Sequence, residues 1–448
     1  MEVYKFKDLI HKKLYTIKIG YDIMSAIKLM NYMELINMKE LRCLIVGGGQ
    51  RGDGMCVYLG ETPRVRIVAT CDLYEDRAVA LADKCEKHFG FRPTPYTDID
   101  EAAKHDIDAV YIASSWETHI PFAIKFMELG IPVMLEVGGA YSVDDCFRLV
   151  EAYEKTKTPI MMLENCCFAQ AELLATGMAR NGLFGEIVHC EGAYAHDLRE
   201  EITFGEENRH YRLRNYINRN CENYPTHELG PIAKLLNINR GNRFVSLVSV
   251  ASKAVGLEHY IKNNDKVNPK LKGQKFNQGD VVTTIITCAG GETITIKLDT
   301  TLPRHYRRNF TVQGTKGLYE QDANLVYFDG MEENFHTIEH YLKEINNAEA
   351  YEEKYLCDAW KELTNANKEG GHGGMDVLVL KCAVDCILDG KEIPIDVYDI
   401  AAWMVITPLT EQSIQTGGAP QAIPDFTHGN WITRKPLDVV EFPIYDEE

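Results

Sequence analysis

A glycine-rich turn followed by an isolated acid gives this sequence its clearest chemical signature. The turn reads Gly47-Gly48-Gly49-Gln50-Arg51-Gly52, which is G-x-G-x-x-G, and Asp72 follows 20 residues after Gly52. Glycines there let the backbone approach a diphosphate, and the helix that follows supplies N–H donors and a positive dipole. An acid at the next strand end can bond both ribose hydroxyls and repels a 2′-phosphate. The alternative is a glycine-rich turn beside a solvated Asp. We expect an NAD site, rather than an NADP site, made by Gly47, Gly49, Gln50, Arg51, Gly52 and Asp72.

Two further polar segments come at strand ends, where such sheets bind their ligands. Ser114-Ser-Trp116-Glu-Thr-His119 follows one apolar strand, and Glu136-Val137 ends the next. Ligands bind in the crevice outside the carboxyl ends of the strands of an open α/β sheet. We therefore expect Ser114, Trp116 and His119 over the cofactor crevice, and Glu136 and Val137 beside the nicotinamide ribose. For Trp116 and His119, the alternative is loop packing and an ordinary helix start.

The elements that must position these residues alternate between strand and helix. Apolar runs predict strands at residues 41–46, 65–71, 108–113, 132–136 and 159–164. Helical periodicity falls between them, at residues 52–59, 76–88, 119–129 and 142–155. Alternation at this spacing is typical of a doubly wound parallel sheet. We expect an α/β protein whose residues 41–165 form an NAD-binding Rossmann domain.

The regular alternation of predicted strands and helices ends after residue 165. Longer strand-like stretches follow at residues 187–194, 244–254, 281–288, 293–300 and 309–313, with helices at 170–181, 375–388 and 397–407. The polar stretches 205–225 and 256–280 are expected to be long loops or lids. We expect residues 166–448 to form a substrate-binding α+β domain with a large, mostly antiparallel sheet, its last helices packing back near the domain junction. Residues 1–40 are expected to be an N-terminal extension, helical over 21–38.

The composition excludes several classes of protein. A net charge of −18 over 448 residues disfavours a nucleic-acid partner, because phosphate binding needs a basic face. The sequence has no apolar run near the ~20 residues that span a membrane, and its first 40 residues lack a signal-peptide pattern. Thirteen scattered cysteines favour reduced thiols over a disulfide framework. We therefore expect a cytoplasmic protein without a membrane partner and without a metal site.

With these motifs in order, residues 40–440 resemble the glucose-fructose oxidoreductase / inositol dehydrogenase (Gfo/Idh/MocA) family. Most oxidoreductases of that family carry Glu-Lys-Pro at the strand end, where the lysine assists proton transfer from the substrate hydroxyl. This chain has Glu136-Val137-Gly138 instead. The missing lysine disfavours a simple dehydrogenase.

A narrower resemblance is to the family 109 glycoside hydrolases. It is carried by MLENCC at 162–167, EGAYAHD at 191–197, YPTH at 224–227, RHYRR at 304–308 and GGMD at 373–376. The resemblance implies NAD dependence and the founding activity of that family, α-N-acetylgalactosaminidase. It also implies a redox-neutral cycle in which C3 of the sugar is oxidised, the C1–O bond breaks by elimination, water adds and the ketone is reduced again. Gly138 departs from the proline of many members, and this chain has an extension where secreted members have an export signal.

The resemblance implies catalytic roles for two residues. Tyr194 would remove the proton from C2, which requires help in ionising a phenol of pKa near ~10. His227 would accept the proton of the C3 hydroxyl in place of the missing lysine. The alternatives are a packed strand tyrosine and a histidine that caps or fills a helix.

Other residues would bind the substrate or support the site. Tyr224 would contact the sugar beside His227, and Arg212 and Tyr306 match substrate-contacting positions, although Arg212 is chosen over Arg214 by spacing alone. Glu164 would hold a sugar hydroxyl and Asn165 would touch the nicotinamide side. Candidates with a supporting role are His196, Asp197 and, in the glycine loop 370–374, His372, for which a tight structural turn is the alternative.

Three functions remain open at the level of sequence. The leading one is an NAD-dependent glycoside hydrolase acting on a small glycoside or oligosaccharide, with N-acetylgalactosaminides suggested by the resemblance. The second is an NAD-dependent sugar or glycoside 3-dehydrogenase, and the third a non-catalytic protein that senses NAD or a sugar. A homo-oligomer is compatible with each, because exposed sheet faces often pair.

Overall fold

The computed structural model describes residues 40–331 and 337–445. The description below concerns the compact unit formed from Leu41 onward. The helix expected at 21–38 lies outside the described residues.

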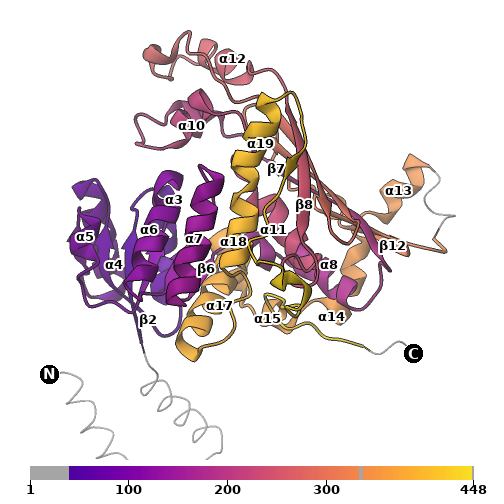
Figure 1. The fold of residues 1–448 in the computed structure, drawn as a ribbon, viewed down its shortest axis with the longest axis horizontal. Coiled ribbons are helices and arrows are strands. Elements are labelled where there is room, and N and C mark those ends of the chain that lie inside the picture. The colour runs from indigo at the N-terminus through magenta and orange to yellow at the C-terminus, as the bar shows by residue number, and fades with distance from the viewer. Residues whose placement is uncertain (1–39, 332–336, 446–448) are drawn as a thin grey trace, which may run out of the picture. The chain divides into compact units, whose positions relative to one another are not determined.

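Six parallel strands form the first sheet, in the order β3-β2-β1-β4-β5-β6 (Figure 1). The strands are β1 (Leu41–Val46), β2 (Val65–Cys71), β3 (Thr94–Tyr96), β4 (Ala109–Ile112), β5 (Val133–Leu135) and β6 (Ile160–Met162). The helices between them are α3 (Gln50–Glu61), α4 (Glu75–Phe89), α5 (Ile99–Ala102), α6 (Trp116–Glu128) and α7 (Val143–Thr156). The predicted doubly wound sheet is confirmed, and its strand order reverses between β1 and β4, where such folds bind ligands.

The edge strand β3 was not predicted from the sequence. It is three residues long and contains Pro95. A proline cannot donate to a sheet ladder, so it disfavours a strand in sequence reasoning but is tolerated at an edge.

Eight strands form the second sheet, in the order β13-β12-β11-β7-β10-β9-β8-β14. The strands are β7 (Ile187–Ala195), β8 (Phe244–Ala251), β9 (Val281–Cys288), β10 (Thr293–Asp299), β11 (Thr311–Gly314), β12 (Gly317–Glu320), β13 (Leu325–Phe328) and β14 (Gln421–Ala422). Only β7 and β10 pair in parallel among these described strands. The predicted mostly antiparallel sheet is therefore confirmed.

Helices cover one face of this sheet. The helices of the chain after β6 are α8 (Gln170–Arg180), α9 (Arg199–Thr203), α10 (Arg212–Asn218), α11 (Thr226–Leu235), α12 (Gly256–Lys262), α13 (Ile338–Glu344), α14 (Glu352–Tyr355), α15 (Asp358–Lys361), α16 (Asn365–Glu369), α17 (Met375–Asp389), α18 (Val397–Met404) and α19 (Ile406–Gln415). Short 3₁₀ turns are η1 (Asn165–Phe168), η2 (Pro269–Leu271), η4 (Asn347–Tyr351), η5 (Gly371–Gly374) and η6 (Asn430–Ile432). Helix α11 packs on β7 and β10, and α19 packs on β8.

The late helices also touch the first sheet and its helices. Helix α17 packs against α3, and α18 packs against α7 and β6. The single helix expected at 397–407 is in fact two helices. Val405 separates α18 from α19, and the second helix continues to Gln415. Pro408 occupies the first turn of α19, where a missing N–H breaks no helical bond.

The two stretches expected to be loops contain helices α10 and α12. Leu213 and Tyr216 of α10 are buried, as are Leu257 and Ile261 of α12. Each helix is seven residues long, so tertiary burial stabilises it rather than a periodic pattern that a sequence would reveal. Figure 1 places α10 and α12 above the first sheet and its helices.

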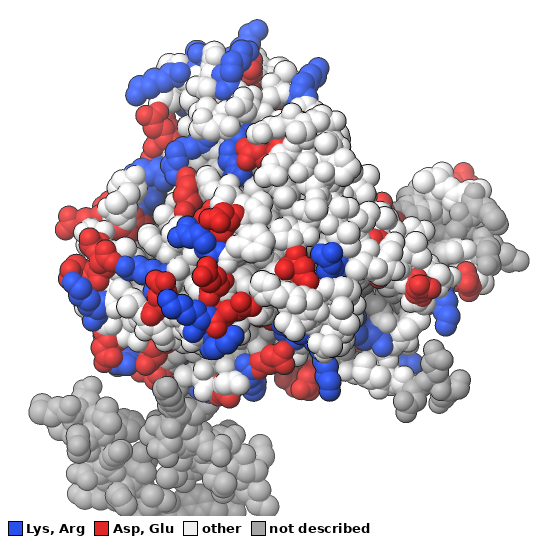
Figure 2. Space-filling model, in the orientation of Figure 1, with Lys and Arg blue, Asp and Glu red and all other residues white. Residues whose placement is uncertain are grey.

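No helix in the described part of the chain has the length and apolar character that a membrane span requires. Acidic and basic side chains are interleaved over the helices of the first sheet, whereas the face over α18, α19 and β8 is largely uncharged (Figure 2).

Candidate active site

A cavity of about 1430 Å³ lies at the carboxyl ends of the first sheet. Its walls come from the glycine turn, the ends of β2, β4 and β5, strand β7, and the segments around α9, α10 and α11. It therefore brings together residues from both halves of the chain.

The glycine turn forms one wall through its backbone. Gly47 has φ +104°, and a Cβ there would lie 2.5 Å from the carbonyl oxygen of Ala113. Gly52 does not line the cavity, but a Cβ there would lie 1.8 Å from the carbonyl oxygen of Gly47. Gly49 precedes the first residue of α3. These glycines let the turn fold back so that the N-terminus of α3 faces the cavity.

Asp72 follows β2 and holds the turn from the other side. Its carboxylate accepts hydrogen bonds from the backbone N–H of Gly48 at 2.7 Å and of Tyr74 at 2.9 Å. Asp72 lines the cavity, as do Gly47, Gly49, Gln50 and Arg51.

His119 presents an unpaired acceptor. Its Nε2 lies 3.0 Å from the carbonyl oxygen of Ser114 and must carry the hydrogen, because a carbonyl only accepts. Its Nδ1 is buried and has no hydrogen-bond partner among the described residues. Burial lowers the pKa of His119 to about 4, so the ring is neutral near pH 7. Ser114, Trp116 and His119 all line the cavity.

A chain of hydrogen bonds crosses the floor of the cavity from Glu136 to Asp376. Glu136 accepts from Tyr111 Oη at 2.9 Å and from Arg51 Nε at 2.8 Å. Arg51 Nη2 donates to Asp376 Oδ1 at 2.9 Å, and Asn165 Nδ2 donates to the same oxygen at 2.8 Å.

Asp376 is thus a site residue that the sequence did not assign. Its only sequence signal is its place in the Gly-Gly-Met-Asp motif. Val137 also lines the cavity.

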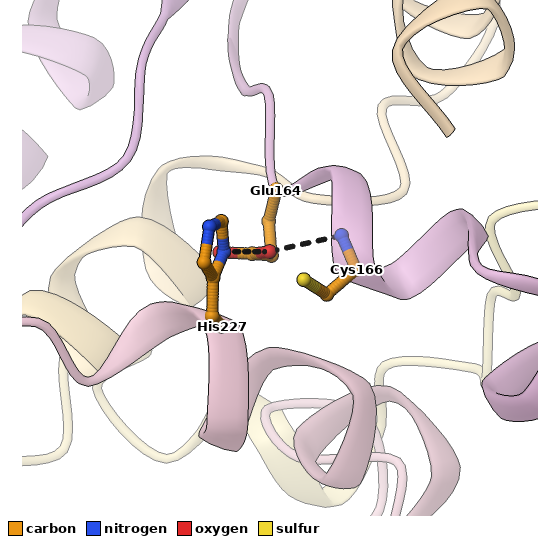
Figure 3. Close-up of side chains that lie close together, drawn as sticks. All are labelled: Glu164, Cys166 and His227. Carbon is orange, nitrogen blue, oxygen red and sulfur yellow. Dashed lines mark hydrogen bonds and ion pairs between the residues drawn. The ribbon is translucent and has the colours of Figure 1, made fainter. Parts of the chain in front are cut away.

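Glu164 lies behind His227 (Figure 3). Glu164 Oε1 is 2.7 Å from His227 Nδ1 and also accepts from the backbone N–H of Cys166 at 3.0 Å. This second bond caps η1 and turns the carboxylate away from the cavity. Glu164 has no exposed surface and does not line the cavity, whereas His227 does. The structure therefore places Glu164 where it orients the imidazole, not where a sugar hydroxyl was expected to meet it.

The ion pair sets the charge of both groups. Burial disfavours the His227 imidazolium, but Cys166 and Glu164 outweigh burial and raise the pKa of His227 to about 10. Burial also opposes the carboxylate, and His227 nevertheless holds the pKa of Glu164 below its ordinary value. The other nitrogen of the ring, Nε2, forms a long hydrogen bond with Tyr224 Oη at 3.4 Å.

Glu164, Cys166 and His227 also have the side-chain types that bind transition metals. Their potential ligand atoms lie within 4.8 Å of one another, as Figure 3 shows. Their arrangement is already satisfied by the hydrogen bond between Glu164 and His227, so we do not assign a metal to it.

Tyr194 enters the cavity from β7. It is 7% exposed, and its ring centroid lies 4.5 Å from that of Tyr224 and 5.6 Å from that of His227. Burial raises the pKa of the Tyr194 phenol, and the nearby charge of Arg212 acts in the opposite direction. The three rings form one wall of the cavity.

Arg212 lies between aromatic rings at the start of α10. Its guanidinium carbon lies 4.8 Å from the ring centroid of Trp116 and 5.0 Å from that of Tyr224. Nε is 2.5 Å from Glu201 Oε1, without the alignment of a hydrogen bond. Nη1 is buried and has no hydrogen-bond partner among the described residues. Arg214, by contrast, bonds Glu117 and is 60% exposed.

Tyr306 is not among the described residues that line the cavity. It is 50% exposed, and its ring packs edge-on against His196 at 5.2 Å. His196 and Asp197 do line the cavity, with Tyr224 and Asn165.

Comparison with known proteins identifies the family. The model for the C-terminal domain of glycosyl hydrolase 109 matches residues 168–433. The chain belongs to this family. The model for the NAD-binding Rossmann fold of the Gfo/Idh/MocA oxidoreductases matches residues 41–163. Both resemblances expected from the sequence are confirmed.

Relatives of the family 109 chain are similar over most of their length. The α-N-acetylgalactosaminidase of Tannerella forsythia is 37% identical over 83% of both chains. A family 109 protein of Solibacter usitatus is 35% identical over 89% of this chain and 90% of its own. The protein is accordingly a glycoside hydrolase.

Solved structures with the same fold are oxidoreductases. One from Agrobacterium radiobacter, in complex with NAD⁺, L-tartaric acid and magnesium, has a TM-score of 0.61 at 17% identity and covers 87% of this chain and 99% of its own. The myo-inositol 2-dehydrogenase of Lactobacillus plantarum has a TM-score of 0.61 at 15% identity and covers 86% of this chain and 100% of its own. At these identities the likeness concerns the fold.

Proposed function

We propose that this family 109 enzyme is NAD-dependent and hydrolyses α-N-acetylgalactosaminides through transient oxidation at C3 of the sugar. The observation that carries the proposal is the meeting of two sets of residues in one cavity. The glycine turn and Asp72 line it at one end, and Tyr194 and the oriented His227 line it at the other. The printed activity of the Tannerella forsythia relative supports the choice of sugar.

The residues at the first sheet fit NAD. Gly47 lines the cavity at φ +104°, a conformation that glycine favours and that lets the turn bend around a diphosphate. The unpaired Nδ1 of His119 offers an acceptor to a ligand donor. We propose that Gly47, Gly49, Gln50, Arg51, Gly52, Asp72, Ser114, Trp116, His119, Glu136, Val137 and Asn165 form the cofactor site. The chemistry that NAD supplies when bound is reversible acceptance of hydride from C3.

His227 would take the proton of the C3 hydroxyl on Nε2. Glu164 occupies Nδ1, so Nε2 is the nitrogen that faces the cavity. It can receive a proton only in the neutral ring, which a pKa of about 10 makes the minor form near pH 7, so this step is favoured by high pH. The resulting imidazolium is stabilised by the Glu164 carboxylate. It would then donate a hydrogen bond to the C3 oxygen, where negative charge develops when C2 loses its proton.

Tyr194 would remove that C2 proton. The pair of electrons from the C2–H bond forms the C1–C2 double bond as the C1–O bond breaks, and the leaving oxygen takes a proton. Water then adds at C1, and the proton returns to C2. Only the phenolate is a base, and the Arg212 charge favours it against burial.

Arg212 and the rings beside it would recognise the sugar. The unpaired Nη1 can donate to a sugar oxygen, and the faces of Trp116 and Tyr224 can pack on its C–H groups. Tyr224, beside His227, would contact the sugar as well. In this proposal Glu164 positions His227. Tyr306 would support the substrate end of the cavity by packing against His196, which lines it.

We further propose that residues 41–165 act as the cofactor domain and 166–448 as the substrate domain, since each sheet falls within one range. The substrate would be a small glycoside or oligosaccharide.

All thirteen cysteines are free, which supports a reducing, cytoplasmic setting. Val250 and Ile285, exposed on neighbouring strands of the second sheet, support pairing of two copies.

Hydrolysis of α- and β-aryl glycosides in deuterated water tests the proposal. We expect cleavage of the α-N-acetylgalactosaminide, deuterium at C2 of the product and no accumulation of NADH. A 3-dehydrogenase would instead build NADH in proportion to substrate, and Tyr194→Phe would retain oxidation. A sensing protein would bind NAD or sugar and release no product. Either result would overturn the hydrolase mechanism.

A further inference from the structure

The segment of residues 204–211 joins α9 to α10 and reaches the first sheet from the other half of the chain. Asn208 and Arg209 of this segment line the cavity together with Asp72. An acid at this strand end binds the ribose of a dinucleotide, so the adenosine end of the cofactor would lie here. The segment is therefore placed to cover the half of the cofactor that takes no part in hydride transfer.

Two contacts fasten the 204–211 segment to the first turn of α4. The Arg209 guanidinium donates two hydrogen bonds to the Asp76 carboxylate, at 2.9 and 2.7 Å. Arg77 donates to the carbonyl oxygen of Asn208. One contact uses a side chain of the segment and the other uses its backbone, so the segment is held from both partners at a single place beside the cavity.

The loop between β2 and α4 leaves apolar surface open next to these contacts. Leu73 lines the cavity and is 80% exposed. Beside it, the Tyr74 ring has the guanidinium carbon of Arg209 at 4.3 Å from its centroid. Large apolar side chains that stay open at a cavity wall are surfaces that a ligand can cover. An adenine base bound here would cover Leu73.

The backbone of the segment presents Arg209 to its partner. Arg209 has φ 49°, a left-handed conformation that residues with a side chain seldom adopt. The backbone N–H of His210 donates to the carbonyl oxygen of Gly205 at 2.7 Å and closes the turn that holds it. Such a conformation persists where the surrounding structure maintains it, and it is frequent at ligand clamps.

We propose that residues 204–211 form a clasp that retains the dinucleotide through the catalytic cycle, with the pair of Arg209 and Asp76 as its latch. The proposal rests on the NAD dependence proposed above. In a redox-neutral cycle the hydride taken from C3 returns to the same sugar, so early loss of the reduced cofactor would leave a ketone that cannot be reduced again. Exposed ion pairs are weak, which allows the latch to open when the cofactor is loaded.

The rate at which NADH leaves the protein tests the clasp. Protein loaded with NADH is mixed with excess NAD, and the change in NADH fluorescence is followed by stopped flow. Arg209→Asn removes the latch, and asparagine tolerates the left-handed backbone. Asp76→Asn removes the carboxylate partner. Glu75→Gln is the matched control, because Glu75 is the other acid in the first turn of α4 and is not among the described residues that line the cavity.

We expect NADH to leave Asp76→Asn about threefold faster than wild type, the effect of losing an exposed ion pair. Release from Arg209→Asn should be about tenfold faster, because the contact with Tyr74 is lost as well. The double variant should match Arg209→Asn within about twofold, since both changes remove the same pair. Glu75→Gln should release NADH at the wild-type rate.

Two results would overturn the clasp: wild-type release rates in both single variants, or a double variant whose acceleration is the product of the two single effects. Failure of the wild-type protein to bind NADH would instead refute the proposed cofactor.

Discussion

His227 meets the cavity with one ring nitrogen because Glu164 holds the other. The 2.7 Å hydrogen bond between them lies below the cavity wall, where water does not compete for it. A buried carboxylate partner both selects the tautomer and favours the charged ring. The pH at which His227 can accept a proton therefore depends on Cys166 and Glu164, neither of which lines the cavity.

Glu164→Gln removes that carboxylate charge. The pKa of His227 should fall from about 10 toward its ordinary 6.5. Because the base must be neutral, the rising limb of kcat against pH should move to lower pH, while kcat falls by about 100-fold with the loss of the imidazolium partner. Rate profiles from pH 5 to 10 measure both effects. The surface change Glu151→Gln is the control, and an unmoved limb in Glu164→Gln would contradict this role.

Glu222 and Glu228 form a second buried acidic group near the site, one on each side of the turn that carries Tyr224. Both are almost fully buried, and among the described residues neither has an ion-pair partner. Burial raises the pKa of Glu222 to about 8, and burial together with Glu222 raises that of Glu228. The folded protein therefore holds protons that the unfolded chain releases above pH 4.5.

Stability should consequently fall as pH rises from about 5 to 8. A group whose folded pKa is raised stabilises the fold fully below its unfolded pKa and loses this effect as pH passes the folded value. Each proton that the folded protein holds and the unfolded chain has released lowers the free energy of unfolding by about 1.4 kcal/mol for each unit of rising pH. Glu222→Gln stays neutral, so its free energy of unfolding in urea should depend less on pH than that of wild type. Exposed Glu128→Gln should keep the wild-type slope; equal slopes in all three proteins would exclude a neutral buried acid.

At the scale of elements, the contact between β1 and α3 is made by glycines. The first turn of α3 can lie against the end of β1 only because Gly52 has no side chain.

The segment around α10 closes over the same region from the other half of the chain. Arg209 bonds Asp76 on α4, and Arg214 bonds Glu117 on α6. These exposed ion pairs contribute little stability, so the buried Tyr216 and Arg212 must hold α10 in place.

Gly52→Ala should destabilise the fold by about 1–3 kcal/mol, because the turn must shift to admit the methyl group. Gly54→Ala is the matched change in the same helix. No atom lies within 4 Å of the Cβ it would add, and alanine favours a helix by up to ~1 kcal/mol over glycine. The free energy of unfolding in urea should be lower than that of wild type for Gly52→Ala and higher for Gly54→Ala. A stability of Gly52→Ala equal to that of Gly54→Ala would show that the close approach is not required.

At the scale of the whole molecule, the cavity joins the two sheets. Asp72 follows a strand of the first sheet, and Tyr194 lies on a strand of the second. A ligand that fills this cavity contacts both, so its binding energy adds to the stability of the folded chain.

NAD at a hundredfold excess over its Kd should stabilise the protein by about 2.7 kcal/mol. Thermal melting in the presence of NAD, NADP or neither measures this effect. NADP should raise the melting temperature less, because Asp72 repels its 2′-phosphate. In Asp72→Ala, NAD should raise the melting temperature by less than it does in wild type. The rises caused by NAD and by NADP should also differ less. An equal response of the wild-type protein to both cofactors would contradict the role of Asp72.

The sequence by itself determined the local parts of this protein. Strand β1, the glycine turn, the start of α3 and Asp72 could be predicted because they follow one another in the chain and obey short-range rules of backbone geometry. The alternation of apolar residues along β9 and β10 likewise predicted strands of the second sheet. Short elements such as β3, α10 and α12 could not be predicted, because burial against distant segments stabilises them.

Only the tertiary structure decided which side chains meet. Glu164 was expected in the cavity, but capping of η1 turns it to the back of His227. Asp376 gathers Arg51, Asn165 and His372 although it lies more than 200 residues from the first two. A local sequence sets the backbone path of a segment, whereas the direction and partner of a buried polar side chain depend on what the rest of the chain packs against it.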